Sequence, residues 1–270
     1  MAALGFIVDS FDLVSNFTAE IKRLGTFDGV LTSSNAAPQR GGLTIDTVEH
    51  EYLALQSVTL ETPNYERILI KDLSFNLPPG EAVLVVGPSG VGKSSLMRAV
   101  AGLWNAGTGC IFRPKRQDMM FLPQRPYMLL GNLRSQLLYP NNSSEVTDEL
   151  LQEILEQVNL ADLSKRLGGF DLELEWADIL SLGEQQRLAF ARLLLSKPRY
   201  AILDESTSAL DVENEKHLYQ LLKKTGTTFI SVGHRPTLVP YHEHVLKLGS
   251  HGDWQLISAE EYSPRSREFA

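Results

Sequence analysis

The chain has 270 residues, 43% of them hydrophobic, which is enough for one sizeable core with an appendage or for two small domains. The formal net charge of −8 argues against a nucleic-acid partner, because phosphate contacts need an excess of lysine and arginine on one face. The single cysteine, Cys110, excludes an internal disulfide framework and suits a reducing compartment.

Apolar residues recur at three- and four-residue steps from Leu4 to Leu24, which predicts an amphipathic helix within residues 1–31. The pattern leaves open whether this helix packs on its own domain or on a partner. No stretch reaches the roughly 18 to 20 apolar residues of a membrane span. Residues 32–42 are polar and rich in turn-forming residues, so they are interpreted as a linker before a domain over residues 43–270.

The domain alternates strand and helix patterns. Residues 43–61 and 68–77 predict a small antiparallel sheet, and apolar runs predict core strands at 82–86, 119–123, 200–203 and 227–232. Helical patterns lie between them, including residues 147–160, 184–196 and 212–225. The fold class is therefore α/β with a mainly parallel core sheet.

Each core strand ends on a polar or flexible residue, namely Gly87, Gln124, Asp204 with Glu205, and His234. In open α/β sheets, ligands bind beyond the carboxyl ends of the strands. We therefore expect these residues to converge on one nucleotide.

The loop after the first core strand reads GPSGVGKSS, which fits the phosphate-loop pattern between a strand and a helix. Glycines let backbone N–H groups turn onto phosphate oxygens, the helix start adds its positive dipole end, and a serine can ligate Mg²⁺. The alternative is a glycine-rich turn with an incidental lysine. The nucleotide-binding residues expected here are Gly87, Pro88, Ser89, Gly90, Val91, Gly92, Lys93, Ser94 and Ser95, with Ser94 also a metal ligand and Lys93 also a catalytic residue.

Four residues at the other strand ends are candidates for metal binding and catalysis. Asp204 would hold Mg²⁺ through water, and Glu205 would orient and deprotonate the water that attacks the γ-phosphate. The Gln124 amide could ligate Mg²⁺, and His234 could donate to the γ-phosphate or hold the water of Glu205. The alternatives are an ordinary acidic strand exit and a structural histidine.

The stretch LSLGEQQR, residues 180–187, places a serine and a glycine at the start of a second helix, which creates a second anion site. One nucleotide cannot easily use both helix starts of a single chain. Two chains arranged head-to-tail can each lend this helix start to the other's γ-phosphate, which would make hydrolysis depend on dimerisation.

The phosphate loop, Gln124, LSLGEQQR, ILDE, Ser208-Ala209-Leu210-Asp211 and His234, in that order, resemble the ATP-binding domain of ABC transporters over residues 43–257. The resemblance implies an ABC-type fold with a helical subdomain at about 125–182, and ATP and Mg²⁺ as ligands. It also implies a transmembrane domain in cis or in trans and a place at the cytoplasmic face of a membrane. In a dimer, the opposite ATP would contact Ser181, Leu182, Gly183 and Glu184, and Asp211 would lie at the interface.

The segments LPQRPYM, GNLR and GHRP resemble the corresponding sequences of the peroxisomal fatty-acyl transporter (D) subfamily and its bacterial vitamin B12 and peptide half-transporter relatives. In those proteins a transmembrane domain precedes the ATPase, so residues 1–31 resemble the end of its last helix or a cytoplasmic extension of it. Two positions depart from the common pattern: Leu182 stands where the signature has a glycine, and Thr62 stands where an aromatic residue stacks on adenine. Tyr65 is the substitute we expect for that aromatic.

The sequence therefore predicts an ATP-hydrolysing subunit or domain of an ABC transporter. The alternative is a soluble ABC-type ATPase or a nucleotide-sensing module without catalysis, although Glu205 and His234 are both present. For His242 and His244, a solvated loop or strand is favoured over a metal pair.

Overall fold

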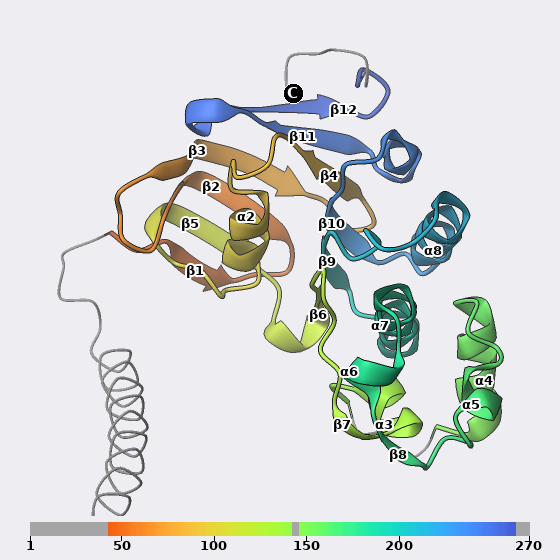
Figure 1. Ribbon diagram of the computed structural model, residues 1–270. Coiled ribbons are helices and arrows are strands. Elements are labelled where there is room, and N and C mark those ends of the chain that lie inside the picture. Colours follow the sequence, from red (N-terminus) through yellow and green to blue (C-terminus); the bar gives the residue numbers. More distant parts are fainter. Residues whose placement is uncertain (1–42, 142–145, 263–270) are drawn as a thin grey trace, which may run out of the picture. The chain divides into compact units, whose positions relative to one another are not determined.

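The central element of the computed structural model, which describes residues 43–141 and 146–262, is a six-stranded sheet (Figure 1). Its strand order is β12-β11-β4-β10-β9-β6. All neighbours pair in parallel except β11 and β12, which confirms the mainly parallel sheet. The strands are β4 (Ala82–Val86), β6 (Met119–Leu122), β9 (Tyr200–Asp204), β10 (Thr228–Val232), β11 (His244–Leu248) and β12 (Trp254–Ser258).

The core sheet is buried on both faces, which explains why its strands are continuous apolar runs. Because successive strand residues point to opposite faces, Val83 and Val85 of β4 join one buried cluster, while Ala82 and Leu84 join the other. The alternation of β4 therefore supplies two hydrophobic layers from one strand.

A second sheet packs over one of these layers, in the order β1-β5-β2-β3. It comprises β1 (Asp46–Glu49), β2 (Leu53–Glu61), β3 (Ile68–Leu77) and β5 (Gly107–Arg113). The prediction of an antiparallel sheet is correct for the pair β2–β3 but wrong for β1, which pairs with β5 in parallel. Strand β2 also pairs with β5, antiparallel. The sequence interpretation missed β5 because that strand follows the phosphate-loop helix, far from its neighbours along the chain.

Helix α2 (Lys93–Val100) contributes its apolar side chains to the layer between the two sheets. Leu96 and Met97, both fully buried, share this cluster with residues of β2, β3, β4 and β10. The start of α2 is thereby fixed directly after the β4 strand end.

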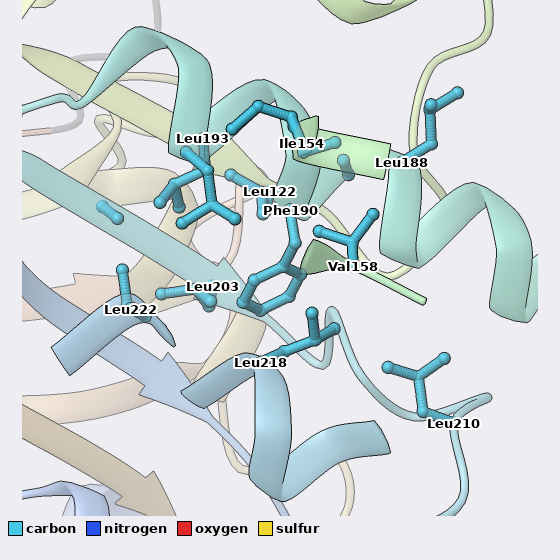
Figure 2. Close-up of a cluster of buried hydrophobic side chains, with 14 of the residues drawn as sticks. Leu122, Ile154, Val158, Leu188, Phe190, Leu193, Leu203, Leu210, Leu218 and Leu222 are labelled. Carbon is cyan, nitrogen blue, oxygen red and sulfur yellow. The ribbon is translucent and has the colours of Figure 1, made fainter. Parts of the chain in front are cut away.

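The buried cluster on the opposite face of the core sheet includes residues of α7 (Leu182–Ser196) and α8 (Val212–Lys224), and of α4 (Asp148–Gln157), which packs against α7. Figure 2 shows the ring of Phe190 from α7 between Leu203 of β9 and Leu218 of α8. The three helices match predicted ones to within three residues at either end. Burying a phenylalanine contributes about 1.5–3 kcal/mol, so this contact helps fix α7 against the strand that ends at Asp204.

The segment between β6 and α7 holds short elements that periodicity did not predict. They are β7 (Leu130–Asn132), α3 (Leu133–Leu138), α5 (Leu163–Arg166), β8 (Glu173–Glu175) and α6 (Trp176–Ile179), with β7 and β8 paired antiparallel. Elements of three to six residues are too short to show a hydrophobic period. The described residues also form the 3₁₀ turns η1 (Arg116–Asp118), η2 (Pro236–Tyr241) and η3 (Ser250–Gly252).

The expected helix at residues 1–31 and the linker at 32–42 lie outside the described residues. Within the described ranges, every helix is too short or too polar to cross a membrane.

Candidate nucleotide-binding site

Four neighbouring parallel strands bring the candidate residues to one edge of the core sheet. The order β4-β10-β9-β6 is continuous, and Val232 of β10 pairs with Val85 on one side and with Asp204 on the other. The residues that follow these strands, Gly87, His234, Glu205 and Gln124, therefore leave the sheet side by side.

The phosphate loop depends on glycine at two positions. A Cβ added to Gly87 would collide with the backbone carbonyl oxygen of Leu248, so only glycine fits beside β11. Gly92 precedes α2 with a φ of 107°, and its added Cβ would meet the Cβ of Leu69 at 3.0 Å. The tight path of this loop is therefore set by its packing against β3 and β11.

Lys93 is the first residue of α2, and its side chain is folded into the loop. It is 6% exposed and donates hydrogen bonds to the carbonyl oxygens of Gly87 at 2.9 Å and Pro88 at 2.8 Å. Burial lowers the pKa of Lys93, while the nearby carboxylates of Glu205 and Asp204 act in the opposite direction. A cationic donor is thus held at the helix start, where anions bind.

Ser94 and Asp204 are 110 residues apart in sequence and are joined by a hydrogen bond of 2.9 Å from the Ser94 Oγ to the Asp204 Oδ1. Burial raises the pKa of Asp204, although the hydrogen bond from Ser94 opposes the rise. A hydroxyl and a carboxylate side by side are oxygen ligands of the kind that Mg²⁺ prefers. These two residues therefore fit a magnesium ion.

The carboxylate of Glu205 is held from two sides. Its Oε2 accepts a hydrogen bond from the Gln124 side-chain amide at 3.0 Å, and its Oε1 lies 2.9 Å from the His234 Nε2. The backbone of Glu205 has a φ of 50°, which is unfavourable for a residue other than glycine and is maintained by its surroundings. The structure thus places two of the predicted catalytic residues, Gln124 and His234, around the carboxylate of a third.

The start of α7 has the capping box that its sequence indicates. The Ser181 hydroxyl accepts from the Glu184 N–H at 3.3 Å, and the Glu184 carboxylate accepts from the Ser181 N–H at 2.9 Å and its hydroxyl at 2.8 Å. Burial raises the pKa of Glu184, but hydrogen bonds from Arg166 and Ser181 outweigh this effect and lower it overall. Glu184 is therefore ionised beside the helix start, and hydrogen bonds from Arg166 and Ser181 stabilise its charge.

Leu182, the departure from the common signature, is the first residue of α7 and is half-buried. Gly183 follows it, and an added Cβ there would lie 3.3 Å from the carbonyl oxygen of Ala209. The signature helix thus packs closely against the segment that follows Glu205. Asp211, at the end of that segment, caps α8 by accepting from the Asn214 N–H at 2.8 Å.

Gln186 is a residue of this region that the sequence interpretation missed. It is fully buried on α7, donates to the Gln124 carbonyl oxygen at 2.9 Å and the Ser208 hydroxyl at 3.2 Å, and accepts from the Ala209 N–H at 3.0 Å. A signal was present, since Gln186 lies four residues before Phe190 and hence on the same, buried face of the helix.

The structure also gives the positions of Tyr65 and His242, two further residues considered in the sequence analysis. Tyr65 lies in the turn between β2 and β3, where its N–H donates to the Thr62 carbonyl oxygen at 2.8 Å. His242 was expected in solvent but is 4% exposed, because its ring bonds Leu238 and Ser231 inside the core. No cluster of three metal-ligating side chains occurs in the part of the chain that the structure describes.

Comparisons with known proteins identify the family. The family model described as ABC transporter matches residues 70–208. An ABC transporter ATP-binding protein of Synechocystis sp., named as uncharacterized, is 50% identical over 262 residues, 95% of this chain and 40% of that protein. ATP-binding cassette sub-family D member 3 of Mus musculus is 43% identical over 209 residues, 76% of this chain and 32% of that protein.

The lysosomal cobalamin transporter of Mus musculus is 42% identical over 214 residues, 75% of this chain and 35% of that protein. The structure of a bacterial Atm1-family ABC exporter with ATP bound matches with a TM-score of 0.69 at 25% identity, over 81% of this chain and 40% of that one. The chain thus spans between 32% and 40% of the length of the three relatives named here.

The family match covers more than half of the chain, so the chain belongs to the ABC transporter family and contains its ATP-binding domain. The predicted resemblance to the D subfamily is confirmed, because the sub-family D member 3 protein and the lysosomal cobalamin transporter ABCD4 are 43% and 42% identical to this chain.

Proposed function

We propose that the chain hydrolyses Mg²⁺-ATP as the ATPase of an ABC transporter. The observation that carries the proposal is the Glu205 carboxylate, which Gln124 and His234 hold at hydrogen-bonding distance beside the Ser94–Asp204 pair. A positioned carboxylate next to a magnesium site and a phosphate loop is suited to activate water against a phosphoryl group.

The phosphate loop would bind the nucleotide phosphates through its backbone N–H groups and Lys93. Ser94, Asp204 and the Gln124 side chain would hold the Mg²⁺, which when bound neutralises phosphate charge. Lys93 would exchange its two carbonyl partners for phosphate oxygens, since a charged acceptor is the stronger one.

Glu205 would accept the proton of the attacking water, and His234 would donate to the γ-phosphate. Tyr65 would stack on the adenine. Its turn directly precedes β3, and Leu69 of β3 packs against Gly92 of the phosphate loop. The roles of Glu205 and His234 both belong to residues that follow neighbouring strands of the core sheet.

A second copy of the domain would complete the site head-to-tail. Ser181, Leu182, Gly183 and Glu184 start α7, whose N-terminal end carries the positive end of the helix dipole and favours an anion, and Ser181 is exposed. These residues would contact the ATP of the partner copy, with Asp211 at the interface.

We further propose that a transmembrane domain, in cis or in trans, works with this ATPase at the cytoplasmic face of a membrane. The relatives are two to three times as long as the segment they share with this chain. In this proposal, residues 1–31 belong to the end of that domain or its extension and 32–42 are the linker. Residues 43–270 are the ATPase, with the helical subdomain at about 125–182.

The test is steady-state ATP hydrolysis by the 270-residue chain, compared with Glu205→Gln and Lys93→Ala. We expect Glu205→Gln to retain ATP binding and to lose about 10²- to 10⁴-fold in turnover, because the amide cannot accept the water's proton. Lys93→Ala should weaken ATP binding itself. ATP binding with equal turnover in wild type and Glu205→Gln would contradict hydrolysis and favour the nucleotide-sensing module.

Dimerisation is tested with the same Glu205→Gln variant, which should accumulate the ATP-bound state. Light scattering after size-exclusion chromatography should show 30.0 kDa without ATP and about twice that mass with it. A monomer at saturating Mg²⁺-ATP would contradict the head-to-tail site. Separation of native membrane and soluble fractions, probed with an antibody to the ATPase, tests the membrane association.

A further inference from the structure

A buried carboxylate outside the predicted site residues is bonded to the segments that follow β9 and β10. Glu215, in the first turn of α8, is 2% exposed. Its Oε1 accepts a hydrogen bond from the Thr207 hydroxyl at 2.7 Å, and its Oε2 accepts one from the Thr237 hydroxyl at 3.2 Å. The same Oε2 lies 3.4 Å from the Arg235 Nη1, so the charge is paired.

These partners come from the two chain segments that carry catalytic candidates. Thr207 stands two residues after Glu205, whereas Arg235 directly follows His234 and Thr237 stands three residues after it. Glu215 therefore links the segment that leaves β9 to the segment that leaves β10.

Arg235 extends the link toward the predicted dimer interface. Its Nη1 donates to the carbonyl oxygen of Leu210 at 2.8 Å, and its Nη2 to that of Ser208 at 3.5 Å. Leu210 precedes Asp211, the residue expected at the interface. Through Arg235, the position of residues 208–210 is tied to the position of His234.

Buried carboxylates are costly to desolvate, and well-packed apolar side chains often stabilise a fold as well as a buried ion pair does. A charged network adds geometric specificity, since each hydrogen bond fixes the distance between its donor and acceptor atoms. Here the network fixes the relative position of two backbone segments. One carries Glu205 and the other carries His234, and these two side chains lie 2.9 Å apart.

We propose that Glu215 is a positioning residue for ATP hydrolysis. Together with Arg235, it holds Glu205 and His234 in register and couples this register to the segment that ends at Asp211. The proposal rests on the ATPase activity proposed above. Glu215 contributes to the rate through Thr207, Thr237 and Arg235, and has no part in nucleotide binding.

The first experiment compares Glu215→Gln with Glu213→Gln in the full chain. Glu213 lies in the same helical turn, but its side chain is 86% exposed and pairs with Lys216 on the surface, at 3.2 Å. We expect Glu215→Gln to lower kcat about 10- to 100-fold, as misplaced catalytic groups do, with KM within about twofold of wild type. Glu213→Gln should match wild type in both constants.

Because Glu215→Gln also removes a buried charge, the rates are expressed per folded site, counted by titration with a fluorescent ATP analogue. A double variant, Glu215→Gln with Arg235→Gln, adds a further control. If Glu215 and Arg235 act as one unit, the double variant should lose little more kcat than either single variant does. A loss of kcat that vanishes after correction for folded sites would overturn the proposal, as would a rise in KM that accounts for the effect.

A second readout separates this proposal from the proposed ATPase. The imidazole resonance of His234, assigned by comparison with His234→Gln, reports its contact with Glu205 without any turnover. We expect Glu215→Gln to shift or broaden this resonance and Glu213→Gln to leave it unchanged. If the chain proves inactive while the resonance shifts, the positioning stands and the ATPase proposal fails. An unshifted resonance overturns the positioning role whatever the activity is.

Discussion

The side-chain amide of Gln186, buried on α7, donates a hydrogen bond of 2.9 Å to the backbone carbonyl oxygen of Gln124. The same side chain bonds the Ser208 hydroxyl and the Ala209 N–H. One residue of the signature helix thus contacts the segment after β6 and the segment after β9. A displacement of α7 therefore has a direct route to two strand ends of the site.

Gln186→Met keeps the size of the side chain but removes its three hydrogen bonds. We expect the free energy of unfolding to fall by about 1–3 kcal/mol, because polar groups are left unpaired in a largely buried place. Turnover should fall as well, with ATP binding retained, since the phosphate loop is not touched. Chemical denaturation and steady-state kinetics measure the two effects. Gln185→Met is the matched control, as the Gln185 side chain donates to the Ala177 and Leu180 carbonyl oxygens, and equal rate losses in both variants would contradict the coupling.

Gly87→Ala should abolish nucleotide binding and destabilise the fold, because the added methyl group collides with the rigid backbone of Leu248. Gly90→Ala is the control, since an added Cβ there has no atom within 4 Å and only its φ of 79° opposes it. We expect that strain to cost about 1–2 kcal/mol, with nucleotide binding weakened less than in Gly87→Ala. Thermal unfolding and fluorescent-nucleotide titration compare the two, and equal binding would speak against the close approach to β11.

Ser181→Ala removes the cap of α7, and we expect the free energy of unfolding to fall by about 0.5–2 kcal/mol. Thr147→Ala removes an equivalent cap from α4, where the threonine side chain accepts from the Leu150 N–H. The two variants should lose similar stability, but only Ser181→Ala should lose turnover under conditions in which the chain dimerises. Parallel losses of turnover would indicate that capping alone explains the effect.

His242 predicts a pH dependence of stability. Burial lowers its pKa to about 4, while the Leu238 carbonyl oxygen and Glu243 oppose the shift and Lys223 adds to it. The folded pKa lies below the ordinary value of 6.5, so the stabilising contribution is complete above pH 6.5 and is lost as the pH falls toward 4.

The expected loss is about 3 kcal/mol over this window, since each pKa unit corresponds to roughly 1.4 kcal/mol. His242→Gln should be less stable at neutral pH and should lack this part of the pH dependence. Urea unfolding between pH 4 and 8 measures it, and identical slopes in the two proteins would exclude His242 as the cause.

Much of the site could be predicted because its residues follow strands whose pattern is strong. The phosphate loop comes after a run of five apolar residues, and Asp204 ends another, so their position at the strand ends needed no tertiary information. The pairing of β1 with β5 was out of reach, since non-local strand pairs leave no local period. The short elements of residues 125–182 were missed for lack of length.

The order of motifs along the chain determined the family and the identity of the phosphate loop, Asp204, Glu205 and the α7 cap, because each depends on local backbone geometry and side-chain chemistry. Only the tertiary structure decided that Glu205 lies between Gln124 and His234, that Gln186 is buried among three segments, and that Glu215 joins the segments after β9 and β10. The physical reason is that these contacts depend on the strand order β4-β10-β9-β6 and on the helices packed on the core sheet, which bring together residues up to 81 positions apart.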